Sequence, residues 1–380
     1  MNGHAADRRR FLATAGAAVA LSLAGCGAGN GAKAGGDGGT GDTAGTAAGG
    51  QSPTTVATVD GVAVEAYAAG LEVPWGAGFH DGTLYLTERP GRIVRVDGGA
   101  VGTVREVDVR ARGEGGLLGL AFHPDGRAAY TYQTYAGDGG TRNRVVRHDV
   151  ADGWRPETAF DGIPGARIHD GGRLLAREGE LYATCGDANE ASAAQDPTAL
   201  NGSVLRLTPD GDPHPDNPFD NPVFTYGHRN PQGLAFRGDD LLSTEHGPNT
   251  DDEVNLLAAG HNYGWPTVRG PSDDDRFTDP LAAYTPTIAP GSTAVYPEDG
   301  PIADWQGDLF FGTLAGTHLH RVRFDGTEVV EQERLFEGRF GRLRTAFVGP
   351  DDHLYVTTSN RDGRGDPRDG DDHVYRFRPA

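Results

Sequence analysis

Three stretches of the sequence gather side chains that could carry out chemistry together. The first reads H-D-G-G-R-L at residues 169–174, and T-C-G-D follows at residues 184–187. The second reads G-H-R-N-P-Q-G at residues 227–233. The third reads E-H-G-P-N-T-D-D-E-V-N at residues 245–255 and is followed by N-Y-G-W-P at residues 262–266. A histidine can serve as a general base near neutral pH, and a fixed cation such as arginine stabilises developing negative charge.

Each stretch alone also has a purely structural explanation. A histidine at the start of a strand is often a hydrogen-bonded structural residue, and the second stretch could be a turn-rich connection. The acidic residues 251–253 could be a solvated face, especially in so acidic a chain. The functional interpretation therefore depends on a fold that brings all three stretches to the same end of neighbouring elements.

One phrase recurs along the chain and predicts that fold. It consists of an apolar triplet, a turn rich in Asp and Gly, and a strand of apolar or alternating character. The copies cover residues 77–87, 120–132, 173–184, 234–244, 302–312 and 346–357. Periods of roughly 45 to 70 residues predict an all-β, six-bladed β-propeller of four-stranded antiparallel blades. A sandwich or barrel would not explain six similar copies, and in a propeller the longer loops gather around the central channel.

The N-terminal segment predicts export and a lipid anchor. Residues 8–10 are arginines and precede a mostly apolar stretch at residues 13–24, which indicates a twin-arginine signal. The stretch ends in L-A-G-C, so Cys26 is the predicted acylated residue; the alternatives are a plain cleaved signal or a chance cysteine. We therefore divide the chain into a lipoprotein signal (1–26), a Gly/Ala/Thr-rich flexible tether (27–55) and a catalytic propeller (56–380), held at the outer face of the cell membrane.

The charge balance excludes some partners. The chain has 54 acidic and 34 basic residues and a net charge of −20, which argues against nucleic acid or an anionic membrane surface as a partner. Lys33 is the only lysine, and an acidic excess with almost no lysine is typical of halophilic proteins. GC-rich codon usage would replace lysine by arginine but would not explain the acidity. Cys185 is the only cysteine after Cys26, so the predicted propeller has no intrachain disulfide.

The three stretches, in this order, resemble the soluble PQQ-dependent glucose/sorbosone (aldose sugar) dehydrogenase family, where PQQ is pyrroloquinoline quinone. The similarity extends from about residue 74 to the C-terminus and includes shorter matches at residues 87–89, 115–119, 202–207 and 216–219. The resemblance implies that aldose sugars are oxidised at C1 to lactones, with PQQ and Ca²⁺ as cofactors.

The resemblance also assigns catalytic roles. His169 occupies the position of the general base that takes the C1 hydroxyl proton while hydride moves to the quinone, and Asp187 would orient its ring. Arg229 would face the quinone oxygen, and Asn230 would hydrogen-bond the cofactor. Glu114 matches a position near the bound sugar that is commonly glutamine.

The remaining matches concern the cofactors. The backbone carbonyls of Gly247 and Pro248 match the site of the calcium ion that also binds PQQ, and Glu253 and Tyr263 match a second, structural calcium site. The paired arginines of G-R-L-R match a carboxylate-binding pair, Arg342 and Arg344. Their spacing of two puts both on one face of a strand.

Three features depart from the family pattern. The lysine expected near Ala315 is missing, and His318 or His320 are the nearest residues that could replace it. Ile168 stands where some members carry Asp before the base, and the substrate loop before residue 287 is short.

Two alternatives stay open: a calcium-dependent lactonase-type propeller hydrolase and, because of the missing lysine, a surface binding propeller without cofactor. The sequence predicts a sugar substrate and leaves its identity, the electron acceptor and the oligomeric state open.

Overall fold

The computed structural model describes residues 54–380. The predicted signal, its acylated Cys26 and residues 27–53 of the predicted tether lie outside the described residues. The described part is built from β-strands, with two short 3₁₀ helices, η1 (Ala191–Gln195) and η2 (Ala303–Trp305), and no α-helix. No helix in this part is long and apolar enough to cross a membrane.

Four of the five sheets are four-stranded antiparallel sheets of consecutive strands. The first contains β3 (Pro74–His80), β4 (Thr83–Glu88), β5 (Arg92–Asp97) and β6 (Ala100–Glu106). The second contains β7 (Leu117–Phe122), β8 (Ala128–Gly137), β9 (Gly140–Asp149) and β10 (Arg155–Pro164). The third contains β11 (Leu174–Arg177), β12 (Glu180–Cys185), β13 (Ser203–Leu207) and β14 (Val223–Tyr226). The fourth contains β15 (Pro231–Arg237), β16 (Asp240–Glu245), β17 (Asp252–Leu257) and β18 (Ala282–Tyr284).

The fifth sheet has nine strands in the order β1-β2-β25-β24-β23-β19-β20-β21-β22. One part contains β19 (Pro290–Val295), β20 (Leu309–Thr313), β21 (Leu319–Asp325) and β22 (Glu328–Leu335). The other contains β23 (Leu343–Val348), β24 (Leu354–Thr358), β25 (Val374–Pro379), β2 (Val62–Ala68) and β1 (Thr54–Val59). A single parallel pair, Ser292 with Thr345, joins the two parts.

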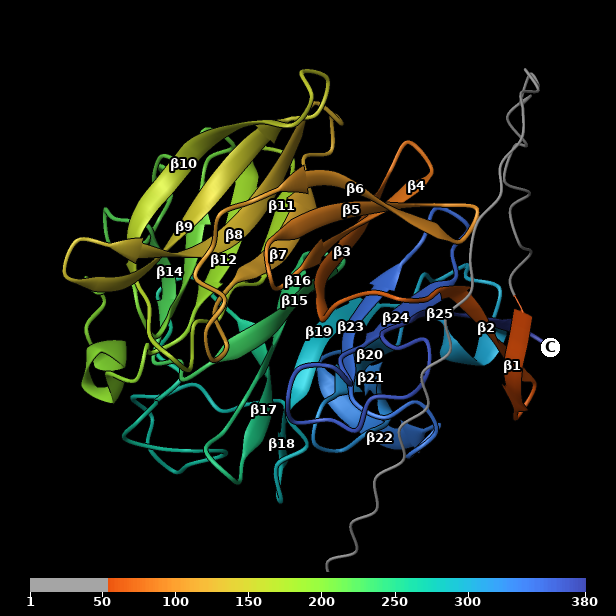
Figure 1. Ribbon diagram of the computed structural model, residues 1–380. Coiled ribbons are helices and arrows are strands. Elements are labelled where there is room, and N and C mark those ends of the chain that lie inside the picture. Colours follow the sequence, from red (N-terminus) through yellow and green to blue (C-terminus); the bar gives the residue numbers. More distant parts are fainter. Residues whose placement is uncertain (1–53) are drawn as a thin grey trace, which may run out of the picture. The chain divides into compact units, whose positions relative to one another are not determined.

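The sheets are arranged as an all-β propeller. Their first strands contact one another in the cyclic order β3, β7, β11, β15, β19, β23 and back to β3. Figure 1 shows several of these strands meeting near the middle of the view. Glycine permits this close approach: a Cβ on Gly119 of β7 would collide with the carbonyl oxygen of Gly172, and one on Gly291 of β19 with that of Arg344. The propeller fold expected from the repeats is therefore confirmed.

One of the six repeats was assigned wrongly within its sheet. The sequence pattern predicts that residues 302–306 are the counterpart of the other apolar triplets, but this segment contains η2, and the strand that precedes β20 in the sheet is β19. The turn residues of P-E-D-G-P, at residues 297–301, lie between β19 and β20. They interrupt the repeated phrase, so the pairing of these two strands is not visible in the sequence.

The N-terminal strands complete the sheet that contains the C-terminal strand. Val62 pairs with Pro379 and Ala68 with Val374, so β2 lies between β25 and the edge strand β1. Val62 and Val64 are buried in the same apolar cluster as Phe310 and Phe377. This pairing closes the ring, and β1 begins at Thr54, two residues before the predicted domain boundary at residue 56.

Candidate active site

His169 lies in a tight turn between β10 and β11, at the end of the third sheet where its first strand begins. Its φ of 62° is in the left-handed region, which is uncommon for a residue with a side chain. Its N–H donates to Oε2 of Glu114 at 2.8 Å, and its carbonyl oxygen accepts from the N–H of Ala188. Because only 11% of its side chain is exposed, these contacts fix the direction of the ring.

Asp187 holds the imidazole from the other side. Nδ1 of His169 lies 2.7 Å from Oδ1 of Asp187, which also accepts from the N–H of Asn189. Trp265 donates its indole N–H to the second carboxylate oxygen at 2.9 Å. Since a carboxylate accepts hydrogen bonds, the proton of the neutral imidazole belongs on Nδ1. Nε2 is then the unprotonated nitrogen, the one that can accept a proton as a general base does.

Arg229 links this base to the third stretch. One guanidinium nitrogen lies 2.8 Å from Nε2 of His169, and the other donates to the carbonyl oxygens of Gly247 at 2.8 Å and His246 at 3.0 Å. Its Nε is buried and has no protein partner among the described residues. Burial lowers the pKa of Arg229, while nearby carboxylates, first that of Asp187, oppose the shift. The predicted base, the predicted quinone-facing cation and a predicted calcium ligand are thus in direct contact.

Glu114 and Asn230 support the turn that carries the base. Oδ1 of Asn230 accepts from the N–H of Gly171 at 3.1 Å, and its amide nitrogen lies 3.4 Å from Oε2 of Glu114. Burial would raise the pKa of Glu114, but the hydrogen bond from the His169 N–H and nearby cations outweigh it and lower the pKa. Both ends of the Asn230 amide are engaged by protein groups, so its immediate role in this structure is to position the turn.

Arg342 and Arg344 converge on one carboxylate that the sequence did not single out. Arg342, just before β23, donates to Oδ2 of Asp362 at 2.9 and 3.0 Å, and Arg344, in β23, lies 4.0 Å from the same oxygen. The expected placement of both arginines on one side of the strand agrees with this geometry. Arg344 is almost fully buried, and burial, reinforced by the nearby cations Arg89 and Arg342, lowers its pKa to about 10.

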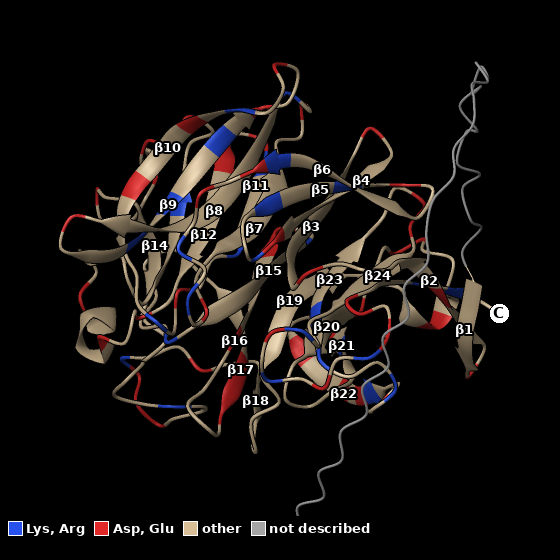
Figure 2. Ribbon diagram, in the orientation of Figure 1, with Lys and Arg blue, Asp and Glu red and all other residues tan. Residues whose placement is uncertain are grey.

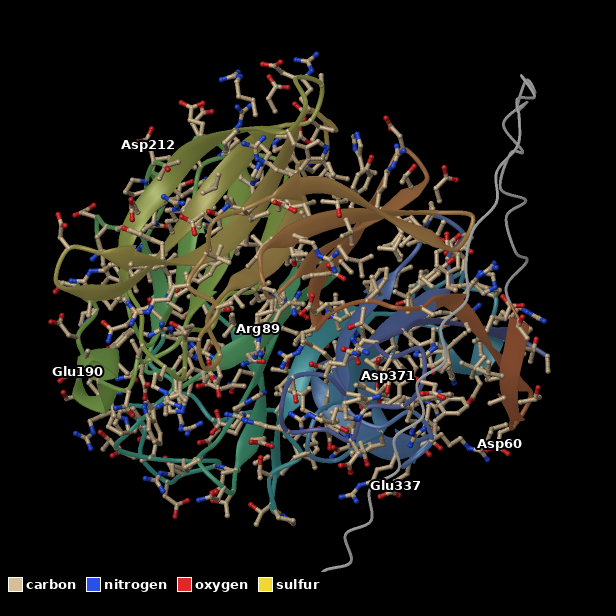
Figure 3. All side chains as sticks on the ribbon, viewed as in Figure 1. Asp60, Arg89, Glu190, Asp212, Glu337 and Asp371 are labelled. Atoms are coloured by element: carbon tan, nitrogen blue, oxygen red, sulfur yellow. The ribbon has the colours of Figure 1, made fainter. Side chains whose placement is uncertain are left out.

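A cavity at the centre of the propeller, here called the central cavity, concentrates positive charge. The residues that line it come from the first, fourth and fifth sheets, their loops and the β6–β7 connection: Trp75, Arg89, Gly113, Glu114, Gln232, His246, Leu314, Arg344, Asp362 and Arg364. Figure 3 shows Arg89 near the middle of the molecule, whereas Glu190 and Asp212 lie toward its outer edge. Three arginines against two carboxylates give the lining a net positive charge in a chain whose net charge is −20.

Arg173 adds a further cation beside the central cavity. It is buried, donates to the carbonyl oxygens of Gln232 and Trp75, and stands 4.3 Å from the ring centroid of Trp75. Burial, followed by the charge of Arg344, lowers its pKa to about 9. No carboxylate of the described residues lies within ion-pair distance of it. In the sequence, Arg173 belongs to the first stretch and to the repeat at residues 173–184, and neither pattern marks it as a cation near a cavity.

A second cavity, here called the Gly247 cavity, contains all four predicted calcium residues. Gly247, Pro248, Glu253 and Tyr263 line it together with Glu245. Burial and the neighbouring charge of Glu245 raise the pKa of Glu253 to about 7. The loop is fixed by Asp252, whose carboxylate accepts from the backbone N–H groups of Gly247, Ile288 and Ala289.

Tyr263 cannot offer its hydroxyl to a metal in this arrangement. The hydroxyl donates to the carbonyl oxygen of Leu256 at 2.6 Å and accepts from the N–H of Ala258 at 3.0 Å. In residues 54–380, no three side chains of His, Cys, Asp or Glu are grouped to hold a metal ion. The oxygens that line the Gly247 cavity therefore include the carbonyls of Gly247 and Pro248 and the carboxylate of Glu253.

His318 and His320 do not replace the missing lysine. Both are buried, their rings are 3.0 Å apart between Nε2 and Nδ1, and His320 packs against Phe311 and Tyr284. Burial lowers the pKa of His318 and lowers that of His320 to about 4, so both rings are neutral near pH 7. The cations that sequence reasoning missed are Arg89 and Arg364, both of which line the central cavity. The match at residues 87–89 was the available signal for Arg89.

The comparison with protein-family models decides the family. The model described as glucose/sorbosone dehydrogenase matches residues 71–366. The chain belongs to this family. The resemblance found in the three stretches is confirmed, and so is the prediction of an oxidoreductase of the glucose/sorbosone dehydrogenase family.

Relatives and solved structures agree with this placement. The aldose sugar dehydrogenase YliI of Escherichia coli is 31% identical over 287 residues, covering 67% of this chain and 77% of the relative. A putative glucose dehydrogenase from Thermus thermophilus is 44% identical with a TM-score of 0.77, covering 83% of this chain and 100% of the other. The PQQ-bound aldose sugar dehydrogenase of Streptomyces coelicolor is 36% identical with a TM-score of 0.76, covering 86% and 98% of the two chains.

Proposed function

We propose that this family member oxidises aldose sugars at C1 to lactones, with PQQ as the cofactor and Ca²⁺ beside it. The observation that carries the proposal is the continuous hydrogen-bonded chain from Asp187 through His169 and Arg229 to the carbonyl of Gly247. When bound, PQQ supplies the acceptor for the two electrons and the hydrogen that leave C1. The PQQ-bound form of the S. coelicolor relative supports this choice of cofactor.

The residues present fit a tricarboxylate such as PQQ. Arg89, Arg344 and Arg364 line one cavity, and the buried Nε of Arg229 has no partner within residues 54–380. Guanidinium groups bind carboxylates through paired, charge-assisted hydrogen bonds. The positive lining therefore provides what the missing lysine would supply in other members.

The oxygen donors of the Gly247 cavity fit calcium. Calcium accepts carbonyl and carboxylate oxygens in flexible geometry, and Gly247, Pro248 and Glu253 offer both kinds. The ion would balance the negative charge of the carboxylates that line this cavity beside Arg229. In this assignment Gly247 and Pro248 hold the ion near the cofactor, while Glu253 and the backbone of Tyr263 belong to a second, structural ion.

The reaction that we assign to the protein side chains is a proton transfer. His169 accepts the proton of the C1 hydroxyl at Nε2, and Asp187 stabilises the resulting imidazolium through Nδ1. Arg229 must release Nε2 before the substrate hydroxyl can reach it, and its charge then stabilises negative charge that develops beside it. Glu114 and Asn230 keep the turn of His169 in place.

The test is reconstitution of the purified protein with PQQ and Ca²⁺, followed by dye reduction with a panel of aldoses. We expect cofactor-dependent reduction that falls to background in His169→Ala and persists in His214→Ala, a histidine of the β13–β14 loop that lines neither the central cavity nor the Gly247 cavity. Absence of PQQ binding at micromolar cofactor would overturn the proposal. Lactone hydrolysis without quinone would favour the calcium-dependent hydrolase instead.

We infer that the site is built on six blades. Two observations support the count: a single parallel pair holds the two parts of the nine-stranded sheet together, and the first strands contact in a cycle that contains two strands of that sheet, β19 and β23. In this interpretation the last blade consists of β23, β24, β25 and β2, and β1 is added at its outer edge. A solution structure whose symmetry differs from six would contradict the count.

We further propose that the enzyme is exported through the twin-arginine route and anchored through Cys26 in a salt-rich habitat. The support lies in the sequence: the arginines at residues 8–10, the L-A-G-C motif and the net charge of −20. Cys26→Ser should move the protein from the membrane fraction to the soluble fraction. Membrane retention of this variant would argue against the anchor.

A further inference from the structure

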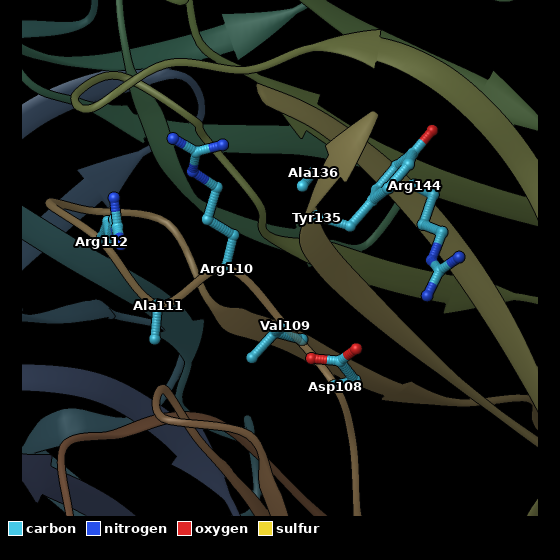
Figure 4. A pocket seen from close by; sticks show the side chains of 8 residues that line it. All are labelled: Asp108, Val109, Arg110, Ala111, Arg112, Tyr135, Ala136 and Arg144. Atoms are coloured by element: carbon cyan, nitrogen blue, oxygen red, sulfur yellow. The ribbon is translucent and has the colours of Figure 1, made fainter. Parts of the chain in front are cut away.

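An open groove lies beside the site and takes no part in the proposed chemistry. Its lining, here called the Arg110 groove, consists of Asp108, Val109, Arg110, Ala111, Arg112, Tyr135, Ala136 and Arg144. In Figure 4 the loop residues 108–112 stand on one side, and Tyr135, Ala136 and Arg144 of the second sheet stand on the other. The groove is thus formed between the β6–β7 connection and the β8–β9 hairpin.

The groove is positively charged although the chain is strongly acidic. Arg110, Arg112 and Arg144 line it against a single carboxylate, that of Asp108. None of the three guanidiniums has a carboxylate within ion-pair distance among the described residues, whereas Arg206, Arg321 and Arg342 do. Figure 2 shows acidic residues along loops at many visible edges of the ribbon. The groove arginines therefore lack carboxylate partners although acidic residues are common elsewhere on the protein.

Two of the groove side chains are held in place. Both Nε and one terminal nitrogen of Arg144 donate to Oε1 of Gln133 at 3.3 and 3.1 Å, and the guanidinium stands 4.8 Å from the ring centroid of Tyr135. The hydroxyl of Tyr135 donates to Asp161. The groove therefore offers an oriented aromatic ring beside an oriented guanidinium, a combination suited to a sugar ring that carries an anionic group.

The loop that forms the groove also carries a residue of the active site. The N–H of Arg110 donates to the carbonyl of Thr134 at 2.7 Å, and four residues later the N–H of Glu114 donates to that of Arg167 at 2.9 Å. The Glu114 carboxylate in turn accepts a hydrogen bond from the backbone N–H of His169. Four residues of extended chain span at most about 14 Å, so the groove lies within reach of a short oligosaccharide whose first ring is at His169.

We propose that the Arg110 groove binds the anionic end of an acidic saccharide whose reducing-end aldose is presented to His169. The inference rests on the proposed oxidation of aldoses and adds a substrate class to it. Arg110 and Arg112 bind the carboxylate of a uronic acid unit, and Tyr135 with Arg144 positions the ring that carries it.

The test compares two disaccharides that differ only in charge, cellobiouronic acid and cellobiose. With the PQQ- and Ca²⁺-loaded enzyme, KM for the acid is expected to be lower than KM for the neutral sugar. In the Arg110→Gln/Arg112→Gln variant, the preference for the acid should fall by about 3- to 10-fold, because exposed charge contacts have modest energies. Arg127→Gln, which removes an exposed arginine at the opposite end of β8, should leave both KM values unchanged.

Calorimetry on the cofactor-free protein separates this inference from the proposed activity. Cellobiouronic acid should bind more tightly than cellobiose, and the difference should shrink in the double variant and at high salt. Acid-selective binding without sugar oxidation would refute the proposed function but not the groove. Oxidation of neutral aldoses with no acid preference, or inorganic sulfate binding in the groove as tightly as the acid disaccharide, would overturn the groove assignment.

Discussion

The hydrogen bonds of Asp187 to His169 and Trp265 determine which nitrogen of the imidazole carries the proton. Oδ2 of Asp187 accepts from Trp265 Nε1 and Oδ1 faces the histidine, so neither oxygen can be replaced by an NH₂ group without two donors meeting. The carboxylate is thus needed for its acceptor capacity at both positions as well as for its charge.

We therefore expect Asp187→Asn to lower kcat by about 10²- to 10⁴-fold, because the amide favours the wrong tautomer of His169. PQQ titration, followed by absorbance, should give an affinity close to that of the original enzyme. Trp265→Phe leaves the carboxylate in place and should cost less activity. Equal kcat values for Asp187→Asn and the original enzyme would refute the positioning role.

Asp170 is a second residue whose charge state follows from burial. Its Oδ1 accepts from Asn143 and from the N–H of Ala166, but Oδ2 is buried and has no partner in the part of the chain that the structure describes. Burial raises the pKa of Asp170 from 3.8 to about 6, although these hydrogen bonds oppose the shift. The folded protein therefore binds the proton more tightly than the unfolded chain does.

The sign of the resulting pH dependence can be tested with Asp170→Asn. Between pH 4 and pH 6 the unfolded chain loses this proton while the folded protein keeps it, so the free energy of unfolding falls as pH rises. The asparagine variant lacks this cost and should be more stable by about 2–3 kcal/mol at pH 8, with little difference at pH 4. Urea denaturation at the two pH values measures the effect. A stability difference that does not change with pH would contradict the assignment.

Strand positions within the blades could be read from the sequence because they depend on local patterns. The strands expected at residues 84–87, 181–184 and 354–357 lie within β4, β12 and β24. Alternating apolar residues between Asp-Gly turns set these limits without information from elsewhere in the chain. Closure of the ring by β2 and β25 could not be read in this way, because it pairs residues about 310 positions apart, such as Glu65 and Arg376.

For the candidate site, too, local patterns predicted the residues but not the contacts between them. The individual residues were found because each belongs to an unusual string, but the contacts between them depend on the conformation of loops. The hydrogen bond from Arg229 to His169 joins residues sixty positions apart, and the pairing of Arg342 with Asp362 joins the start of β23 to the loop after β24. No local periodicity signals Asp362, which lies in the loop between β24 and β25.

The first strand of the second sheet, β7, packs closely against the turn that carries His169. Gly119 of β7 has no room for a Cβ beside Gly172, which lies in the turn that carries His169. Gly119→Ala should cost about 2 kcal/mol or more of stability and should also lower kcat, because the turn has to move. Gly102→Ala on the edge strand β6, where the nearest atom is 4.0 Å away, is the matched control. Thermal unfolding and dye reduction measure both effects, and equal behaviour of the two variants would contradict the close approach.

At the scale of the whole molecule, the net charge of −20 must cost stability when salt is low. Raising NaCl from 0.1 M to 2 M shortens the Debye length from about 10 Å to below 3 Å and screens this repulsion. We expect Tm to rise by several degrees, while sucrose at equal osmolality separates a general solute effect from screening. A Tm that falls or stays constant with NaCl would show that the acidic surface does not limit stability.

The pairing of β2 with β25 also sets the order of events during synthesis. Val62 emerges from the ribosome more than 300 residues before its partner Pro379. Earlier sheets can form as they emerge, whereas the ring can close only after residues 374–379 have been synthesised. Until then β2 and the edge of the first sheet remain without their final neighbours, and this waiting period is when the nascent chain is most exposed to chaperones and proteases.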